Sequence, residues 1–217
     1  MVPVTLVALA ALASPLYTKS APPKNLPCQQ HTILTRAHTI CWTFDDHPTP
    51  ITPRFLAVLK QHQIRGTFFI PSYPLLHYQR CPCRPTRKHY KWIQAIIQAR
   101  HSIGNHSISH ANLCRTSTGR ARREIFLSQQ LFQKYFGIWP RFWRPPHAVL
   151  CPHVQRVVAQ YRLITVMYHV GDWRKSPQQM WSLLRRRVLH NKPYSIVLIH
   201  PNLYKLRQFL RLIKSHP

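Results

Sequence analysis

Short apolar runs alternate along the chain with longer segments in which apolar residues recur every three or four positions. Runs rich in β-branched and aromatic residues predict strands, and the longer periodic segments predict helices. The predicted strands are residues 39–44, 67–70, 163–167 and 195–199. The predicted helices begin near residues 52, 90, 125, 154, 176 and 203, with Ser176-Pro177 opening one of them and Gly137 closing another. Repeated strand–helix units predict a parallel sheet, closed or nearly closed into a barrel, in a single α/β domain.

Residues of catalytic type directly follow several of the apolar runs. Asp45 and Asp46 come after the run 39–44, and His200 comes directly after the last predicted strand. Asp172 also stands just past an apolar run. In barrels of parallel strands, catalytic residues lie in the loops at the carboxyl ends of the strands. We therefore expect these side chains to form one active site.

The chain has only four acidic residues against 31 lysines and arginines: Asp45, Asp46, Glu124 and Asp172. An average chain of this length carries roughly 25 acidic residues. Such depletion leaves no surface-charge reason for the three aspartates, and we interpret them as retained for chemistry. Glu124 follows two arginines, and we expect it to form a helix-surface ion pair of little energetic value.

A formal net charge of +27 would attract polyanions, including anionic polymers of a cell envelope. The alternative is a solvated basic surface without a specific partner. No recognised nucleic-acid-binding module is present, so we expect no specific nucleic-acid partner.

The amino-terminal residues have the pattern of an export signal. Residues 1–13 are mostly apolar, with Ala11-Leu12-Ala13 resembling a cleavage site, although no lysine or arginine precedes the apolar run. A buried helix is the alternative. Residues 14–35 are rich in proline and suit a linker, and 36–217 would be the catalytic domain. We expect an exported protein, periplasmic, envelope-associated or secreted, without a transmembrane anchor after signal cleavage.

The six cysteines allow disulfides in an exported chain, but their connectivity cannot be deduced from sequence. No paired C-x-x-C set is present, which disfavours a thiol metal site. Cys41 lies inside an apolar run, and we expect it to be a buried thiol. Cys81 and Cys83 would help to order an arginine-rich loop.

His106 and His110 are four residues apart, and they are the only such histidine pair in the chain. On a helical turn, residues at this spacing share a face, so both imidazoles could meet one metal ion. One added carboxylate would complete a two-histidine, one-aspartate site with positions open for water and substrate. The alternative is a pair of surface histidines on a helix of a basic protein.

Asp45 and Asp46 cannot both point at the same atom from adjacent extended positions, so one could bind a metal while the other acts as a base. Arg144 lies in a proline-stiffened loop and could hold a carboxylate ionised, or be one more surface arginine. His200 could act as a general acid if a nearby carboxylate raises its pKa, or be a polar strand cap.

Five short motifs together resemble the NodB-type polysaccharide deacetylases, carbohydrate esterase family 4. In chain order they are Thr43-Phe44-Asp45-Asp46, His106-Ser107-Ile108-Ser109-His110, Arg144-Pro145-Pro146, Asp172-Trp173 and Leu198-Ile199-His200. The resemblance extends from about residue 38 to 212. It implies a distorted (β/α) barrel of the NodB-homology type with one divalent metal ion, usually Zn²⁺. Asp46, His106 and His110 would be the metal ligands.

The resemblance also implies the catalytic roles. Asp45 would be the general base, tuned by Arg144. His200 would be the general acid, tuned by Asp172. Trp173 would form a wall of the acetyl pocket.

Three histidines depart from the family pattern. His47 stands where the family usually has glycine, and a positive φ there would strain the backbone. His147 replaces an aromatic residue, and the resemblance implies that its backbone N–H contributes to oxyanion binding in the substrate pocket. His169 occupies a position that is often aspartate.

These observations predict a metal-dependent deacetylase that hydrolyses N-acetyl or O-acetyl groups on a polysaccharide such as chitin oligomers or peptidoglycan. The alternative is a secreted protein that binds polyanions or glycans on a catalytically impaired deacetylase scaffold. The basic clusters at 120–123 and 185–187, together with His47, motivate that alternative.

Overall fold

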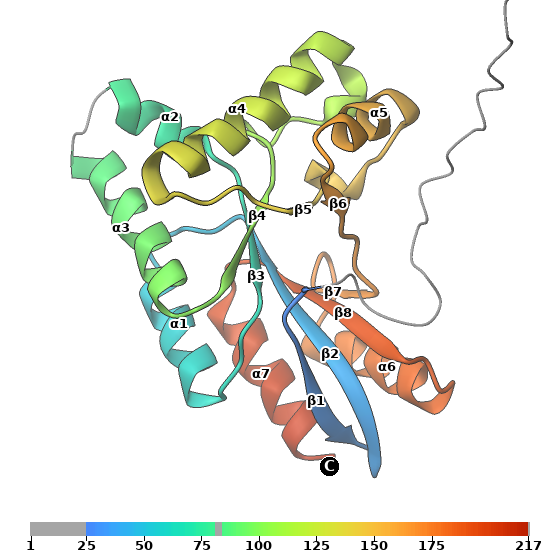
Figure 1. Cartoon of the computed structure of the whole chain (residues 1–217). Helices are drawn as coiled ribbons and strands as arrows, with labels where there is room; N and C mark the ends of the chain where they lie inside the picture. The colour runs from blue at the N-terminus through green and yellow to red at the C-terminus, as the bar shows by residue number, and fades with distance from the viewer. Residues whose placement is uncertain (1–24, 81–83, 217) are drawn as a thin grey trace, which may run out of the picture.

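The computed structural model describes residues 25–80 and 84–216, and these fold around a central β-sheet (Figure 1). The strands are β1 (Cys28–Ile33), β2 (Arg36–Asp45), β3 (Thr67–Ile70), β4 (Ser102–Asn105), β5 (Phe142–Trp143), β6 (Ile164–Thr165), β7 (Val170–Gly171) and β8 (Tyr194–Ile199). The helices are α1 (Thr52–Gln61), α2 (Tyr73–Arg80), α3 (Arg84–Gln98), α4 (Thr118–Phe136), α5 (Pro152–Gln160), α6 (Pro177–Leu189) and α7 (Leu203–Lys214). Two short 3₁₀ helices cover Leu113–Arg115 and Pro146–Ala148.

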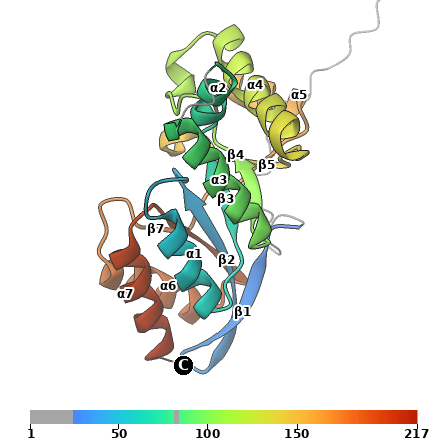
Figure 2. The same cartoon turned by 90° about the vertical axis from the view of Figure 1, so that its left-hand side faces the viewer.

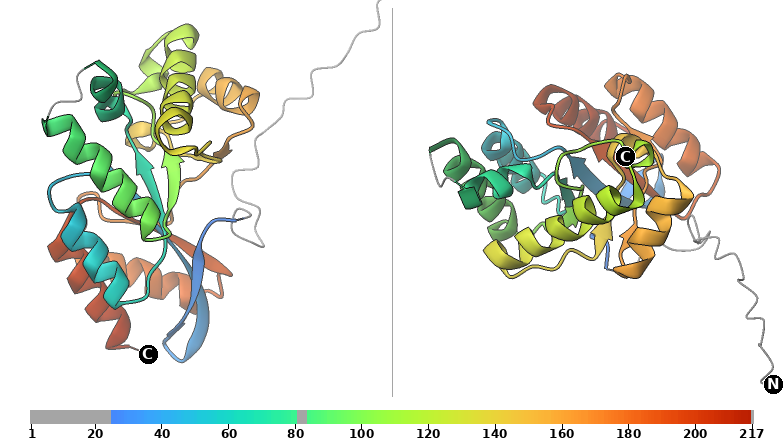
Figure 3. Two further views of the ribbon diagram at one scale, coloured as in Figure 1. Left: turned by 60° about the vertical axis from the view of Figure 1, so that its left-hand side comes forward. Right: turned by 90° about the horizontal axis from the view of Figure 1, so that it is seen from above.

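The strand order is β6-β5-β4-β3-β2-β8-β7, and all neighbours in this order pair in parallel. β1 pairs antiparallel with β2 and adds a hairpin strand to the sheet. The sheet curls into a distorted half-barrel whose ends are β6 and β7, and the helices surround it (Figure 3). The predicted parallel α/β barrel is therefore confirmed. Parallel order matters for function because it places the carboxyl ends of β2, β4, β5, β7 and β8 at one edge.

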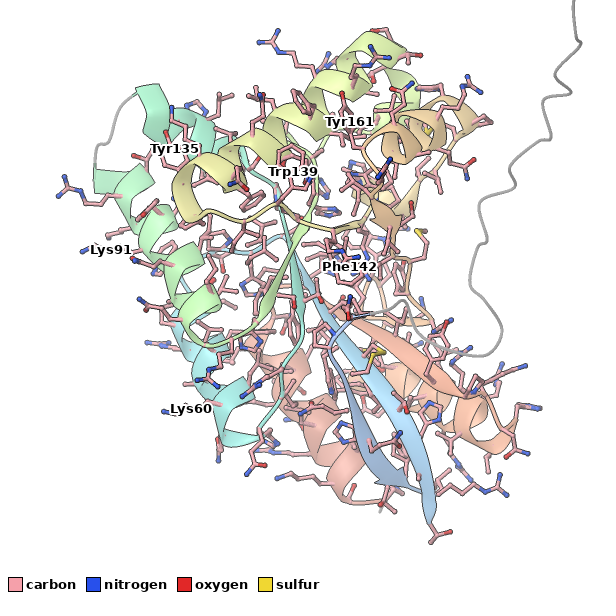
Figure 4. The ribbon with its side chains drawn as sticks, viewed as in Figure 1. Lys60, Lys91, Tyr135, Trp139, Phe142 and Tyr161 are labelled. Carbon is pink, nitrogen blue, oxygen red and sulfur yellow. A yellow bond between two sulfur atoms is a disulfide. The ribbon has the colours of Figure 1, made fainter. Side chains whose placement is uncertain are left out.

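Apolar side chains from both kinds of element fill the interior. A large cluster joins β2, β3 and β8 to α1, α3, α6 and α7, and Phe44 lies within it, edge-to-face against Phe55 with ring centroids 5.2 Å apart. A second cluster joins α4 and α5 to Trp143 of β5. Figure 2 shows α2, α4 and α5 at one end of the molecule and α1, α6 and α7 at the other. In Figure 4, Phe142 belongs to β5 and its side chain is buried, whereas Lys60 and Lys91 point outward from α1 and α3.

Local signals set several helix ends as predicted. α4 ends at Gly137, whose φ of 67° is readily adopted without a Cβ atom. α6 begins after Ser176, which forms a capping box with Gln179, and Pro177 occupies its first turn. α3 starts at Arg84, earlier than the predicted start near residue 90. β6 has two residues, fewer than the predicted run 163–167.

The amino-terminal part of the described chain differs from expectation at two points. β1 lies within residues 14–35, the range that we expect to be a linker. The prediction of a buried thiol at Cys41 is wrong, because Cys41 forms a disulfide with Cys28 across the β1–β2 pair. The apolar surroundings of Cys41 indicated burial but could not reveal its antiparallel partner. The predicted signal peptide at 1–13 and the pair Cys81 and Cys83 lie outside the described residues.

A second disulfide, Cys114–Cys151, joins the first 3₁₀ helix to the residue before α5. None of the helices in the described ranges is both long enough and apolar enough to span a bilayer.

Candidate active site

The carboxyl ends of the parallel strands surround a cavity of about 290 Å³. Asp45 ends β2, His106 follows β4, Arg144 follows β5, and Asp172 and His200 follow β7 and β8. The lining residues are Asp45, Asp46, His106, His110, Arg144, His147, Ala148, Tyr168, Trp173, Leu198 and His200. The structure thus brings together side chains from five segments that are distant in sequence.

Asp46, His106 and His110 form a group that could hold a metal ion. One ligand atom from each lies within 4.8 Å of the others. Asp46 Oδ1 is 3.3 Å from His110 Nε2 and 3.7 Å from His106 Nε2. His106 Nδ1 is 2.8 Å from the carbonyl oxygen of Arg144, which directs Nε2 toward the group.

The protonation of this group also suits a cation. Burial lowers the pKa of both His106 and His110, which favours the neutral imidazole that binds metal. Burial, with the charge of Asp45, raises the pKa of Asp46, so its ionised form lacks positive charge that a bound cation would supply. Asp46 Oδ1 is buried, and no hydrogen-bond donor for it lies among the described residues. An uncompensated carboxylate oxygen between two neutral imidazoles fits a bound divalent ion.

A loop, and not a helical turn, brings the two imidazoles together. Residues 106–110 follow β4 without helical structure, so the predicted helical placement of the pair is wrong. Ser107 and His110 have φ angles of 65° and 58°, in the left-handed region. The Asn105 side chain accepts from the Ser107 N–H (2.8 Å), and the Ser107 hydroxyl accepts from the His110 N–H (3.1 Å). These two hydrogen bonds stabilise a backbone path that most residues disfavour.

Glu124 is not the exposed ion-pair partner that we predicted. Its side chain is buried and accepts hydrogen bonds from the N–H groups of Ile108 (3.0 Å) and Ser109 (2.9 Å) and from the Ser109 hydroxyl (2.7 Å). Glu124 therefore binds the middle of the loop between the two histidines. The scarcity of acidic residues could have pointed to Glu124, because the same scarcity singled out the three aspartates.

Asp45 and Arg144 form a buried ion pair. Arg144 Nη1 lies 2.7 Å from Asp45 Oδ1, and the two residues are 1% and 3% exposed. Arg144 also donates to the Thr43 hydroxyl and to the carbonyl of Val166, which fixes the guanidinium in place. The other Asp45 oxygen is 3.7 Å from His106 Nε2. One carboxylate oxygen is thus anchored by a permanent cation while the second faces the cavity.

His200 and Asp172 form the second charged pair. Asp172 Oδ1 is 2.6 Å from His200 Nδ1, and Oδ2 accepts from the His200 backbone N–H at 3.0 Å. Burial alone would lower the pKa of His200, but the hydrogen bond and charge of Asp172, helped by Asp45 and Asp46, raise it above 6.5. His200 Nε2 lies 3.8 Å from Asp46 Oδ2, so its free ring nitrogen faces the proposed cation group.

Three further side chains wall the cavity. Trp173 is 63% exposed, with its ring centroid 6.1 Å from that of His200. His147 contacts the carbonyl oxygen of His110 through Nε2 (3.1 Å) and has a φ of 59°. Tyr168, which sequence reasoning missed, also lines the cavity, and the Arg144 guanidinium lies 5.9 Å from its ring centre. Tyr168 belongs to no sequence motif, because it reaches the cavity only through the conformation of residues 166–169 between β6 and β7.

His47 and His169 lie away from the cavity lining. Asp46, and not His47, has the positive φ at this turn (59°), so the strain expected at His47 falls on its neighbour. His47 is buried, packs against Phe55, and pairs through Nδ1 with the Thr52 hydroxyl (2.9 Å). Burial lowers the pKa of His47 to about 3. Histidine in place of glycine is therefore accommodated in the core without entering the cavity.

The sequence model of the polysaccharide deacetylase family matches residues 33–166, more than half of the chain. The chain belongs to the polysaccharide deacetylase family. Its parallel half-barrel also agrees with solved structures of carbohydrate esterase family 4, so the resemblance seen in the five motifs is confirmed.

Two bacterial proteins illustrate this membership. A peptidoglycan-N-acetylglucosamine deacetylase of Bacillus cereus is 27% identical over 165 residues, which are 74% of this chain and 55% of that protein. The chain thus spans about half the length of that relative. A family 4 carbohydrate esterase from Streptomyces lividans, solved with acetate, superposes with a TM-score of 0.68 at 22% identity, covering 87% of this chain and 88% of the other.

A third comparison separates fold from activity. A pseudoenzyme of the same family from Bacillus anthracis superposes with a TM-score of 0.66 at 22% identity, covering 81% of this chain and 59% of that one. Structural likeness to a deacetylase therefore does not establish activity, which depends on the residues of the site.

Proposed function

We propose that this polysaccharide deacetylase family member is an active, metal-dependent hydrolase of acetyl groups on a polysaccharide. The observation that carries the proposal is the convergence in one cavity of a cation group, a carboxylate anchored by arginine and a histidine paired with aspartate. Water would add to the acetyl carbonyl carbon, and the bond to the sugar nitrogen or oxygen would break. The products are acetate and a free amine or hydroxyl.

Asp46, His106 and His110 would hold the divalent ion, and the mixture of imidazole and carboxylate donors suits Zn²⁺. Such an ion would polarise the acetyl carbonyl and make water more acidic. Asp45 would accept the proton of the attacking water, because Arg144 anchors one of its carboxylate oxygens and leaves the other facing the cavity. His200 would donate a proton to the leaving amine or alkoxide, because its raised pKa favours the protonated imidazolium. Trp173 and His147 would line the pocket for the acetyl group.

The opposite charge states of Asp45 and His200 are the essential feature of this scheme. One group has to be deprotonated and the other protonated at the same pH, and the two have separate partners on different strands. Separate, unlike surroundings for the proton acceptor and the proton donor are typical of acid–base pairs in hydrolases.

The substrate that we propose is an acetylated glycan of a cell envelope, such as peptidoglycan, with chitin oligomers as test compounds. The B. cereus relative bears the name of a peptidoglycan deacetylase. An extracytoplasmic location agrees with the two disulfides, Cys28–Cys41 and Cys114–Cys151.

The cationic surface supports an anionic envelope polymer as a partner and keeps a second candidate function in view. Within residues 25–80 and 84–216, the ion pairs all involve Asp45, Asp46 or Asp172, so the exposed Arg120 and Arg123 have no carboxylate partner there. A binding protein on an impaired scaffold would use this surface without hydrolysis. Its mark would be salt-sensitive binding to an anionic glycan and no acetate release with any metal.

The deciding experiment measures acetate release from acetylated chito-oligosaccharide, peptidoglycan and xylan. Protein as purified, after chelation, and after return of Zn²⁺, Co²⁺ or Mn²⁺ should be compared. We expect release from at least one glycan, loss with chelator and recovery with metal. Release that is indifferent to chelation would contradict the metal-dependent mechanism, and no release under any condition would favour the binding protein.

A further inference from the structure

Glu124 is the one acidic residue of this chain that has no place in the catalytic scheme above. It comes from α4, yet its carboxylate reaches the loop that joins the two histidines of the cation group. Three donors converge on it: the Ile108 N–H, the Ser109 N–H and the Ser109 hydroxyl. A carboxylate with several N–H donors makes charge-assisted hydrogen bonds, which are stronger than neutral ones.

The loop needs such support because its backbone is unfavourable. Ser107 and His110 are both left-handed, and neither is glycine, so an unsupported loop would relax to other conformations. Relaxation at His110 would move its imidazole away from Asp46. His106 is separately oriented by the carbonyl of Arg144. The spacing of the two imidazoles therefore depends on residues 107–109.

The carbonyl oxygens of Ser107 and Ile108 accept from the N–H groups of Ser72 and Tyr73, both at 3.0 Å, whereas the N–H groups at the centre of the loop are left to Glu124. Other contacts from α4 act on the end of β4. Gln129 accepts from the Asn105 side chain at 2.8 Å, and Asn105 in turn accepts from the Ser107 N–H. Both contacts hold the start of the loop. Ile108 and Ser109, at its centre, donate to Glu124.

We propose that Glu124 is a positioning residue that holds the 106–110 loop in the conformation in which His106 and His110 can bind one cation. The inference rests on the proposed metal site, and it assigns the tightness of metal binding to a helix outside the cavity. It also accounts for all four acidic residues of the chain at one centre. Groups that orient metal ligands typically affect metal affinity by about 10–100-fold.

The test is calorimetric titration of the metal-free full chain with Zn²⁺, which needs no substrate. For Glu124→Ala we expect a Kd about 10–100-fold higher than that of the wild type. Glu124→Gln keeps a carbonyl oxygen for the two N–H donors, so its Kd should rise less than that of the alanine variant. The matched control is Gln130→Ala on the exposed face of the same helix, which should leave the Kd unchanged.

A structural role alone predicts a different result. Acetate release by Glu124→Ala should recover at saturating metal if the residue acts through metal affinity, and should stay low if the fold is damaged. A folded Glu124→Ala protein with the wild-type Kd would overturn the inference. If that variant does not fold, Ser109→Ala, which removes one of the three donors, takes its place. Equal Kd values in Ser109→Ala, Glu124→Gln and wild type would then overturn it.

The result is separable from that of the proposed function. If the wild type binds Zn²⁺ more tightly than Glu124→Ala but releases no acetate, the result would contradict the proposed activity and support the inference. A wild type that binds no divalent metal would overturn both.

Discussion

The same two strands, β2 and β8, carry a histidine cluster at each end. At their carboxyl ends His200 faces Asp46 and pairs with Asp172. At their amino ends His38, from the start of β2, lies 3.0 Å from the hydroxyl of Ser195, in β8. We call this second group, with Arg187 and His169, the His38 cluster. Arg187 donates to the same Ser195 hydroxyl.

The two clusters have opposite electrostatics. Burial first, and then the charge of Arg187, lowers the pKa of both His38 and His169 to about 4. At the other end, the carboxylates overcome the effect of burial and raise the pKa of His200. Buried histidine is therefore not the mark of the active site in this chain, which has fifteen histidines. The feature that distinguishes the candidate site is a histidine beside a carboxylate, because carboxylates are scarce in this chain.

The largest effect should come from removing the proposed base, Asp45, at the carboxyl ends of the strands. Asp45→Asn keeps the shape of the side chain but cannot accept the proton of the attacking water. We expect acetate release to fall by about 10²–10⁴-fold, measured at saturating metal. Ser195→Ala in the His38 cluster is the control, and its activity should stay near that of the wild type. Full activity in Asp45→Asn would contradict the proposal that the carboxylates make the carboxyl ends of β2 and β8, and not their amino ends, the site of catalysis.

Asp172→Asn should change the pH profile at the same end. His200 has to be protonated to act as an acid, so activity is lost as pH rises through its raised pKa. Without the charge of Asp172 that pKa falls, and the alkaline limb should move to lower pH by about 1 unit or more. The measurement is kcat/KM between pH 6 and 10. An unmoved alkaline limb would mean that another group sets it.

At the amino ends of β2 and β8, pH should affect stability instead of activity. The loss there should occur as pH falls, whereas activity is lost as pH rises. The folded-state pKa of His38 is below its unfolded value, so the unfolded chain takes up the proton first. The neutral His38 side chain therefore stabilises the folded state above about pH 6.5, and this stabilisation is lost as pH falls toward 4. His38→Gln should therefore reduce the fall in unfolding free energy between pH 7.5 and 4.5 by about 1–3 kcal/mol, measured with urea. A variant with the wild-type pH slope would contradict the lowered pKa.

The sequence allowed much of the architecture and the grouping of the candidate site residues to be predicted, because both rest on local signals. Asp45 and His200 directly follow runs of apolar residues, and parallel strand order brings such positions to one edge. Gly137 and Ser176 marked helix ends for reasons of backbone geometry. These features depend on neighbours within a few residues.

The missed features depend on partners far along the chain. Glu124 reads as a surface residue among arginines, and only the packing of α4 against the loop after β4 shows its hydrogen bonds. Cys41 forms a disulfide because the register of β1 on β2 places it opposite Cys28. Spacing alone placed His106 and His110 on a helical turn, whereas the left-handed residues of the loop bring them together. Long-range pairing and unusual φ angles leave little trace in a single sequence.

The most direct test of the central claim is to locate the metal. Crystals of the protein with Zn²⁺ should be measured on both sides of the zinc absorption edge. The account predicts one strong anomalous peak within bonding distance of Asp46, His106 and His110, about 2.0–2.2 Å from each ligand atom. A peak at the His38 cluster with none at Asp46, or no peak at all, would contradict it.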